Sequence, residues 1–72
     1  MGLGDVYGHL LNKTVKAVIR GEGERIEIYK GRLIFIGEAF VTVLDFKTNI
    51  EFTFPLERII RIEQSGEGGS NP

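Results

Sequence analysis

The chain is predicted to fold as a small all-β domain: a five-stranded, strongly bent antiparallel barrel preceded by a short helix. Three observations predict this class. Turn signals recur every ~8–12 residues, a spacing typical of small barrels and sandwiches. Val, Ile, Phe and Thr dominate the segments between these turns, and such residues suit a pleated surface. The chain of 72 residues also leaves no room for parallel βαβ units.

The predicted sheet is organised around residues 29–45, which are expected to form two strands joined by a tight turn at Gly37-Glu38. Gly31 lies inside the first of these strands. A glycine there lets a strand bend sharply or lets another backbone approach closely. A bent central strand is what allows a very small sheet to curl, so this segment supports the barrel.

The N-terminal segment has the pattern of about two helical turns. Apolar residues recur at helical spacing between Val6 and Leu11. Asp5 is expected to be the N-cap residue, because its carboxylate can accept hydrogen bonds from the first helical amides. Asn12 is the expected end of the helix.

Five strands are expected after this helix. Pro55 should break or offset the fourth strand, because it cannot donate to a ladder. The domain is predicted to span 1–63, and 64–72, dominated by Gly, Ser, Asn and Pro, is predicted to be a disordered tail. The expected strand ranges are 13–20, 25–36, 39–46, 50–54 and 58–63.

Composition limits the classes of function. Nine Lys and Arg face ten Asp and Glu, which argues against nucleic-acid binding by bulk charge but allows a local basic patch. Cysteine is absent, so no disulfide can staple the small core. The sequence has no apolar run of ~18 residues and no signal-peptide pattern, so we expect a soluble cytoplasmic protein without a membrane partner.

Both faces of the predicted sheet carry apolar residues, although a sheet with one solvent-exposed face should alternate apolar and polar residues along each strand. The N-terminal helix offers a local explanation, but two helical turns are too short to cover so many side chains. We therefore expect copies of the chain to associate through exposed strand edges, and a head-to-tail arrangement that closes would give a ring. The expected interface residues are Ile50, Phe52, Phe54, Ile59, Ile60 and Ile62.

The sequence contains no catalytic constellation. His9 is the single histidine, and it has neither a cysteine nor a second histidine with which to share a metal. A Ser-His-Asp arrangement would have to use Ser65 or Ser70, both in the predicted tail. The protein is therefore not expected to be an enzyme or to hold a metal or cofactor.

Several segments resemble the Sm-like (LSm) proteins, particularly the small single-domain archaeal type. Residues 5–15 are similar to the family's N-terminal helix and first strand, and Tyr29-Lys30-Gly31-Arg32-Leu33 to the aromatic-x-Gly-x-Leu core of the first Sm motif. Leu44-Asp45 matches the end of that motif, and Ile59-Ile60-Arg61-Ile62 the close of the second. The resemblance implies an SH3-like bent barrel, a ring of six or seven copies paired through the fourth and fifth strands, and RNA bound around the pore.

The resemblance fails at the family's uridine pocket. The positions of its Asp, its stacking ring and its Asn hold Gly37, Ala39 and Val41, and its Arg-Gly pair falls on Pro55-Leu56. None of these can stack on a base, read its edge or pair with a phosphate. Phe40 matches a family core position and is expected to be buried.

Basic residues elsewhere are the remaining candidates for RNA contact. Arg58 is the first choice, because it lies beside the loop of the second motif, although pairing with Glu57 or Glu63 would also explain it. We expect an RNA-binding Sm-like ring that acts as a ribonucleoprotein scaffold or chaperone; the alternative is a ring that has lost RNA binding and carries protein partners. The proposed RNA-binding residues are Arg58, Lys30, Arg32 and Arg61, with Lys13, Lys16 and Arg20 on the outer face of the first strand.

Overall fold

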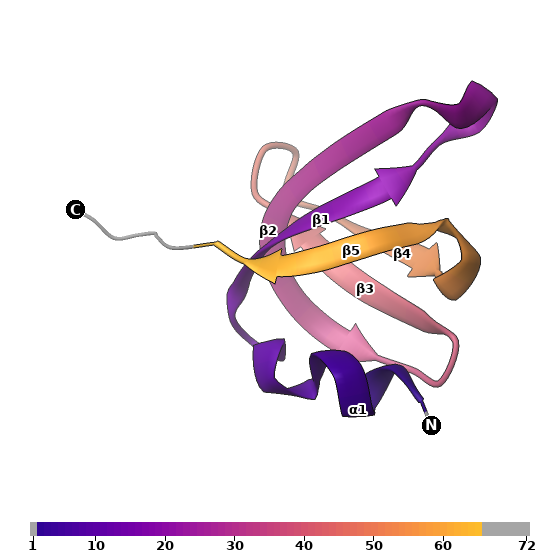
Figure 1. Cartoon of the computed structure of the whole chain (residues 1–72). Coiled ribbons are helices and arrows are strands. Elements are labelled where there is room, and N and C mark those ends of the chain that lie inside the picture. Colours follow the sequence, from indigo (N-terminus) through magenta and orange to yellow (C-terminus); the bar gives the residue numbers. More distant parts are fainter. Residues whose placement is uncertain (1, 66–72) are drawn as a thin grey trace.

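The structure, a computed structural model, describes residues 2–65 and contains a short N-terminal helix followed by five strands (Figure 1). Three single 3₁₀ turns connect these elements, at Gly8–Leu10, Glu22–Glu24 and Leu56–Arg58. The helix and strands are α1 (Leu3–Tyr7), β1 (Thr14–Arg20), β2 (Ile26–Ile36), β3 (Phe40–Asp45), β4 (Ile50–Pro55) and β5 (Ile59–Gln64).

All five strands belong to one antiparallel sheet, in the order β4-β3-β2-β1-β5. The predicted β-rich class, the helix and the five antiparallel strands are therefore confirmed. The predicted barrel is not: the sheet is not closed, because β4 and β5 each pair with a single neighbour. Among residues 2–65, both edge strands consequently keep one side of their backbone without a partner strand.

The long strand β2 curves along its length between its two turns (Figure 1). At Gly31 the neighbouring backbone of β3 comes so close that a Cβ would lie 2.7 Å from the carbonyl carbon of Leu44 and 3.0 Å from the Cα of Asp45. A β-bulge follows, where the register shifts between Leu33 and Phe35, and bulges increase local bending. The prediction that Gly31 permits a close backbone approach is confirmed.

The helix begins earlier than predicted. α1 starts at Leu3, and Asp5 lies in its first turn, where its Oδ2 accepts a hydrogen bond of 3.2 Å from the amide of Gly2. Asp5 as N-cap residue is therefore wrong: its carboxylate still serves the helix start, but from inside the first turn. Asn12 ends the helical segment with a left-handed φ of 67°, as expected for an asparagine.

The core lies on one face of the sheet, beneath the helix. β1 contributes Val15, Ala17 and Ile19, at every second position of the strand and each at most 2% exposed. Leu33 on β2 is fully buried, and Leu10 from the helical segment packs against the same cluster. The other core residues are Leu3, Val41, Val43, Phe54 and Ile62.

The ends of the last strands differ slightly from the prediction. Pro55 is the final residue of β4, opposite Phe40, which is tolerated because β4 is an edge strand. β5 continues through Gln64, and the amide of Ser65 donates to the carbonyl of Thr14 at 2.9 Å. The rest of the predicted tail, 66–72, lies outside the described residues. No helix among residues 2–65 is long and apolar enough to cross a membrane.

Candidate nucleic-acid interface

The outer face of β1 and β2 carries a group of cations. Lys16 and Lys30 are direct partners in the antiparallel ladder, and Arg32 is the partner of Thr14. Lys13, expected on the outer face of the first strand, precedes β1 and is an odd number of positions from Lys16, so strand alternation does not place its side chain on this face. Lys16 and Lys30 must share the outer face, because their neighbours Val15 and Ala17 are buried in the core.

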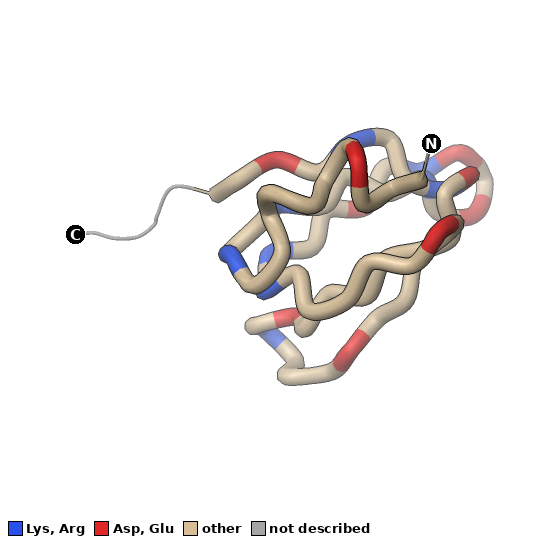
Figure 2. Tube along the Cα trace, turned by 90° about the horizontal axis from the view of Figure 1, so that it is seen from below, with Lys and Arg blue, Asp and Glu red and all other residues tan. Residues whose placement is uncertain are grey.

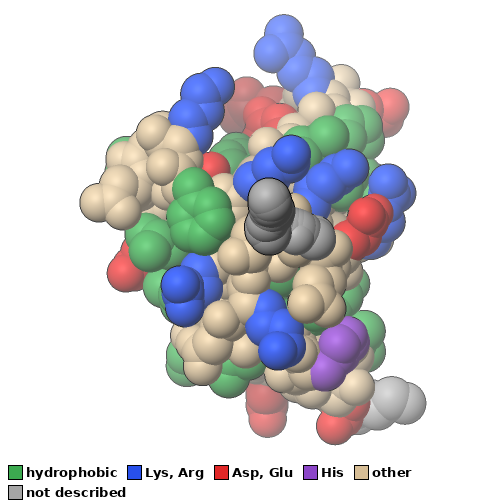
Figure 3. All heavy atoms as spheres, turned by 90° about the vertical axis from the view of Figure 1, so that its left-hand side faces the viewer, with side chains coloured by type: hydrophobic (Ala, Val, Ile, Leu, Met, Phe, Trp, Pro, Cys, Tyr) green, Lys and Arg blue, Asp and Glu red, His purple; other side chains and the backbone are tan. Residues whose placement is uncertain are grey.

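Lys47 joins this group through the β3–β4 turn. The amide of Phe46 donates to the carbonyl of Lys30 at 3.0 Å, which fixes the turn beside β2. Lys47 and Lys30 line one shared cavity there. Figure 3 shows this end of the molecule, with Lys and Arg side chains spread over the middle of the face. We call Lys16, Lys30, Arg32 and Lys47 the basic face.

The basic face brings like charges together, with Glu63 on β5 and Asp45 at the end of β3 as acidic residues beside it. Like charges directly opposite each other in a sheet, as at Lys16 and Lys30, destabilise the pairing. The neighbour of Lys16 on β5 is Glu63, which is itself ion-paired with Arg61. The hydrogen bond from Arg61 lowers the pKa of Glu63 below its usual range, and the charge of Lys16 lowers it further.

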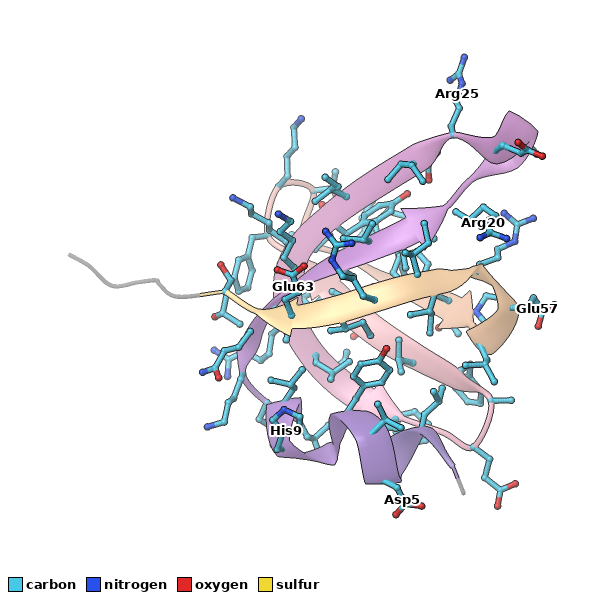
Figure 4. All side chains as sticks on the ribbon, viewed as in Figure 1. Asp5, His9, Arg20, Arg25, Glu57 and Glu63 are labelled. Carbon is cyan, nitrogen blue, oxygen red and sulfur yellow. The ribbon has the colours of Figure 1, made fainter. Side chains whose placement is uncertain are left out.

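The opposite end of the molecule carries the acidic β1–β2 turn. Glu22, Glu24 and Glu27 lie in or next to the β1–β2 turn, and the tube in Figure 2 places Lys and Arg mainly at the end from which the C-terminal trace leaves. Figure 4 shows Arg25 projecting from this hairpin and Arg20 and Glu57 near the same end. Lysines thus gather on the basic face, whereas the other end combines glutamates with Arg20, Arg25 and Arg58.

Arg58, the first choice from the sequence, lies at this other end. Its Nη1 donates to the carbonyl of Arg20 at 3.4 Å. It lines an open cavity of about 620 Å³ together with Glu22 and Glu27. The structure therefore brings Lys30 and Arg32 together on β2, pairs Arg61 with Glu63, and places Arg58 apart from them.

The positions that correspond to the family's uridine pocket do come together. The amide of Leu56 donates to the carbonyl of Ala39 at 2.8 Å, which joins the β4–β5 and β2–β3 turns. Val41 is fully buried. Phe40, expected in the core, is 38% exposed and stacks on Phe35 with ring centroids 5.6 Å apart. Its burial was predicted wrongly, because β3 alternates and the inward position belongs to Val41.

The predicted interface residues fall into three groups. Ile50 and Ile60, on the edge strands, are 52% and 37% exposed. Phe54 and Ile62 are buried in the core, where Phe54 packs against Tyr29 with ring centroids 4.9 Å apart. Phe52 and Ile59 are partly buried against the same core.

Residues 2–65 contain no group of three or more His, Cys, Asp or Glu placed to hold a metal, and His9 is exposed. Comparison of the chain with protein-family models, with curated proteins and with solved structures finds no match. The Sm-like assignment thus stays a prediction from the residues and motifs of the chain itself.

Sequence reasoning missed Phe46 and Lys47 as parts of the interface. Phe46 was expected to be the last residue of the third strand, 39–46, yet it lies beyond the end of β3 and is 52% exposed. The available signal was an aromatic residue next to a lysine in a predicted turn, where neither side chain is needed by the core.

Proposed function

We propose that the protein is a Sm-like module that assembles into a ring of six or seven copies and binds RNA on its basic face. The proposal draws on the resemblance of the two Sm motifs, and the observed element order agrees with it. A short helix precedes five antiparallel strands. The sharply bent barrel that the family adopts would be completed here by strands of neighbouring copies.

Assembly is supported by the two open edges of the sheet. β4 and β5 are the edge strands, and pairing β4 of one copy with β5 of the next is head-to-tail, so it can close into a ring. Ile50 and Ile60 would be covered by such pairing, whereas both are exposed in the single chain. At this chain length, burial of further apolar surface would also strengthen a marginal core.

Native mass spectrometry before and after nuclease treatment tests the assembly. We expect six or seven copies for the unmodified chain and single chains for the double variant Ile50→Lys, Ile60→Lys, because charges on edge strands oppose pairing. Ile26→Lys is the matched control, since Ile26 is 57% exposed but lies on β2 beside the acidic hairpin. A folded single chain at micromolar concentration would overturn the ring.

RNA binding is carried by one observation, the direct pairing of Lys16 with Lys30 in the middle of a basic face. An arrangement of like charges that weakens the sheet is explained if a polyanion binds over it, because phosphates would compensate the lysines. A ring would repeat the basic face around its axis. Linked weak sites then act together through effective concentration, so a nearly neutral chain can still bind RNA.

Fluorescence anisotropy of single-stranded RNA over a series of salt concentrations tests the binding. For the double variant Lys16→Glu, Lys30→Glu we expect affinity to fall at least about tenfold and the salt dependence to become shallower, because fewer counterions are released. Arg25→Glu makes the same kind of charge change on the exposed hairpin at the other end and should have little effect. No binding by the assembled protein at low salt would overturn this function.

A second candidate is a ring that carries protein partners. It is favoured by the exposed pair Phe35 and Phe40 together with Leu56, which is 49% exposed, at the site where the family would hold a base. The RNA titration over a series of salt concentrations also distinguishes the two candidate functions. A ring that ignores RNA at low salt supports the scaffold, whereas salt-dependent binding that needs Lys16 and Lys30 supports the RNA-binding module.

A further inference from the structure

The β3–β4 turn holds an exposed aromatic ring between lysines. Phe46 is 52% exposed and lines a cavity of about 490 Å³ with Ile28, Lys30, Asp45 and Lys47. Ile28, on the adjacent strand, is 56% exposed, so the cavity offers two apolar side chains next to two cations. We call these five residues the Phe46 pocket.

The turn that carries Phe46 is tightly held. Oδ2 of Asp45 accepts hydrogen bonds from the amide of Thr48 at 2.9 Å and from its hydroxyl at 2.8 Å. The carbonyl of Asp45 accepts from the amide of Asn49 at 2.8 Å, and the amide of Phe46 is bonded to Lys30. The Phe46 side chain, carried on such a turn, loses little conformational freedom when a ligand binds, and this favours affinity.

The core does not account for Phe46. It is not part of the core cluster, and the ring pairs found among residues 2–65 use Tyr29, Phe52 and Phe54 or Phe35 and Phe40. An exposed apolar side chain next to another, rimmed by polar groups, is typical of a binding site.

The charges around the pocket select the kind of ligand. Lys30 and Lys47 stand beside Phe46, and Lys16 is the ladder partner of Lys30. Asp45 is only 6% exposed and its Oδ2 is engaged by Thr48, so its one negative charge is held within the turn, and the two lysines that line the cavity outnumber it. A ligand that fits has a flat apolar face and an anionic group close by, as an unpaired nucleotide does.

We propose that Phe46 stacks on an unpaired base of single-stranded RNA while Lys30 and Lys47 contact the adjoining phosphates. The inference rests on the proposed function, because it names a base-binding site on the same basic face. The site is separate from the family's uridine pocket, whose positions lie in the β2–β3 and β4–β5 turns. It would give the protein a preference for unpaired over paired RNA, since a base inside a duplex is not free to stack on the ring.

The experiment compares two probes of equal length and charge, a single-stranded oligoribonucleotide and an abasic ribose-phosphate oligomer. The assembled protein should bind the oligoribonucleotide about tenfold more tightly, the order of magnitude of one stacked base. Phe46→Ala should remove this difference and leave abasic binding unchanged. Phe35→Ala is the matched control, because Phe35 is equally exposed, at 51%, but lies outside the pocket, and its variant should keep the preference.

A Phe46→Trp variant gives a direct readout, because the chain has no other tryptophan. Its fluorescence should be quenched by the oligoribonucleotide and not by the abasic oligomer. If Phe46→Ala keeps the preference, or the tryptophan is not quenched on binding, the base site is overturned while the proposed function stands. If neither probe binds the unmodified protein at low salt, both proposals fail.

Discussion

Gly31 on β2 lies against the backbone of Leu44 on β3 so closely that no side chain fits between them. A Cβ there would collide with the Leu44 carbonyl group, and backbone in the middle of a sheet cannot move aside cheaply. We therefore expect Gly31→Ala to lower the free energy of unfolding by about 3 kcal/mol or more. Chemical denaturation followed by circular dichroism measures this loss.

Gly8→Ala is the control for this prediction. Gly8 has helical dihedral angles, φ −57° and ψ −32°, and a Cβ there would meet nothing within 4 Å. Alanine at such a position should stabilise the protein by about 0.4–1 kcal/mol, because it restricts the unfolded chain. Equal effects of the two substitutions would show that the close approach at Gly31 does not hold in solution.

The like-charge pair Lys16 and Lys30 predicts a conflict between stability and binding. Lys30→Glu should raise the free energy of unfolding by about 0.2–1 kcal/mol, because opposite charges then face each other across the ladder. The same variant should bind RNA more weakly. Thermal unfolding at low and at high salt provides the measurement, since screening should shrink the gain.

For the matched comparison, Arg25→Glu changes the charge equally at the exposed hairpin and should not stabilise the protein. A destabilised Lys30→Glu variant would indicate that the two lysines do not oppose each other, and the basic face would lose its main support.

Strand positions could be predicted from the sequence because they depend on local patterns of apolar residues and turn residues. Val15, Ala17 and Ile19 recur at every second position, and Gly21 and Asn49 lie in the turns between strands, so the predicted bounds agree with the observed ones to within one residue. The bend at Gly31 could also be predicted, because a glycine inside a strand needs a structural reason.

The candidate site was less predictable because it depends on long-range register. Lys16 and Lys30 are separated by a whole hairpin, and only the ladder makes them direct partners. The place of Arg58 beside Glu22 and Glu27 likewise follows from the packing of β5 against β1. Phe40 shows the same limit, since one residue of offset decides whether a strand residue faces the core or solvent.

Tyr29 makes the free energy of unfolding depend on pH in the alkaline range. Its hydroxyl donates to Oε1 of Glu27 at 2.9 Å, and this hydrogen bond, with smaller effects of burial and nearby carboxylates, raises the pKa of Tyr29. The folded state therefore holds the phenolic proton more tightly than the unfolded state. The resulting stabilisation is complete below the ordinary tyrosine value of about 10 and is lost as the pH rises through the folded pKa.

Denaturation of the unmodified protein and of Tyr29→Phe between pH 8 and pH 11 tests this dependence. At the lower pH the variant should be less stable by up to about 1 kcal/mol, the scale of one hydrogen bond. The difference should shrink as the pH rises. Tyr7→Phe is the control, and a difference between Tyr29→Phe and the unmodified protein that stays constant with pH would contradict the assigned hydrogen bond.

Asp45 is a buried carboxylate whose role is to hold the β3–β4 turn. It is 6% exposed, and its Oδ2 receives both hydrogen bonds from Thr48. Asp45→Ala should cost about 1–3 kcal/mol, because the Thr48 amide loses its acceptor in a partly buried place. Asp45→Asn keeps an acceptor oxygen and should cost less.

The β3–β4 turn also positions Phe46, so a substitution that loosens this turn should weaken RNA binding. Thr48→Val removes the hydroxyl donor and keeps the shape of the side chain, whereas Thr48→Ser keeps the donor. We expect Thr48→Val to weaken binding of the oligoribonucleotide more than binding of the abasic oligomer, and Thr48→Ser to resemble the unmodified protein. If Thr48→Val weakens binding of both probes equally, the turn acts on phosphate contacts through Lys47. Base stacking by Phe46 would then not depend on the hydrogen bonds between Asp45 and Thr48.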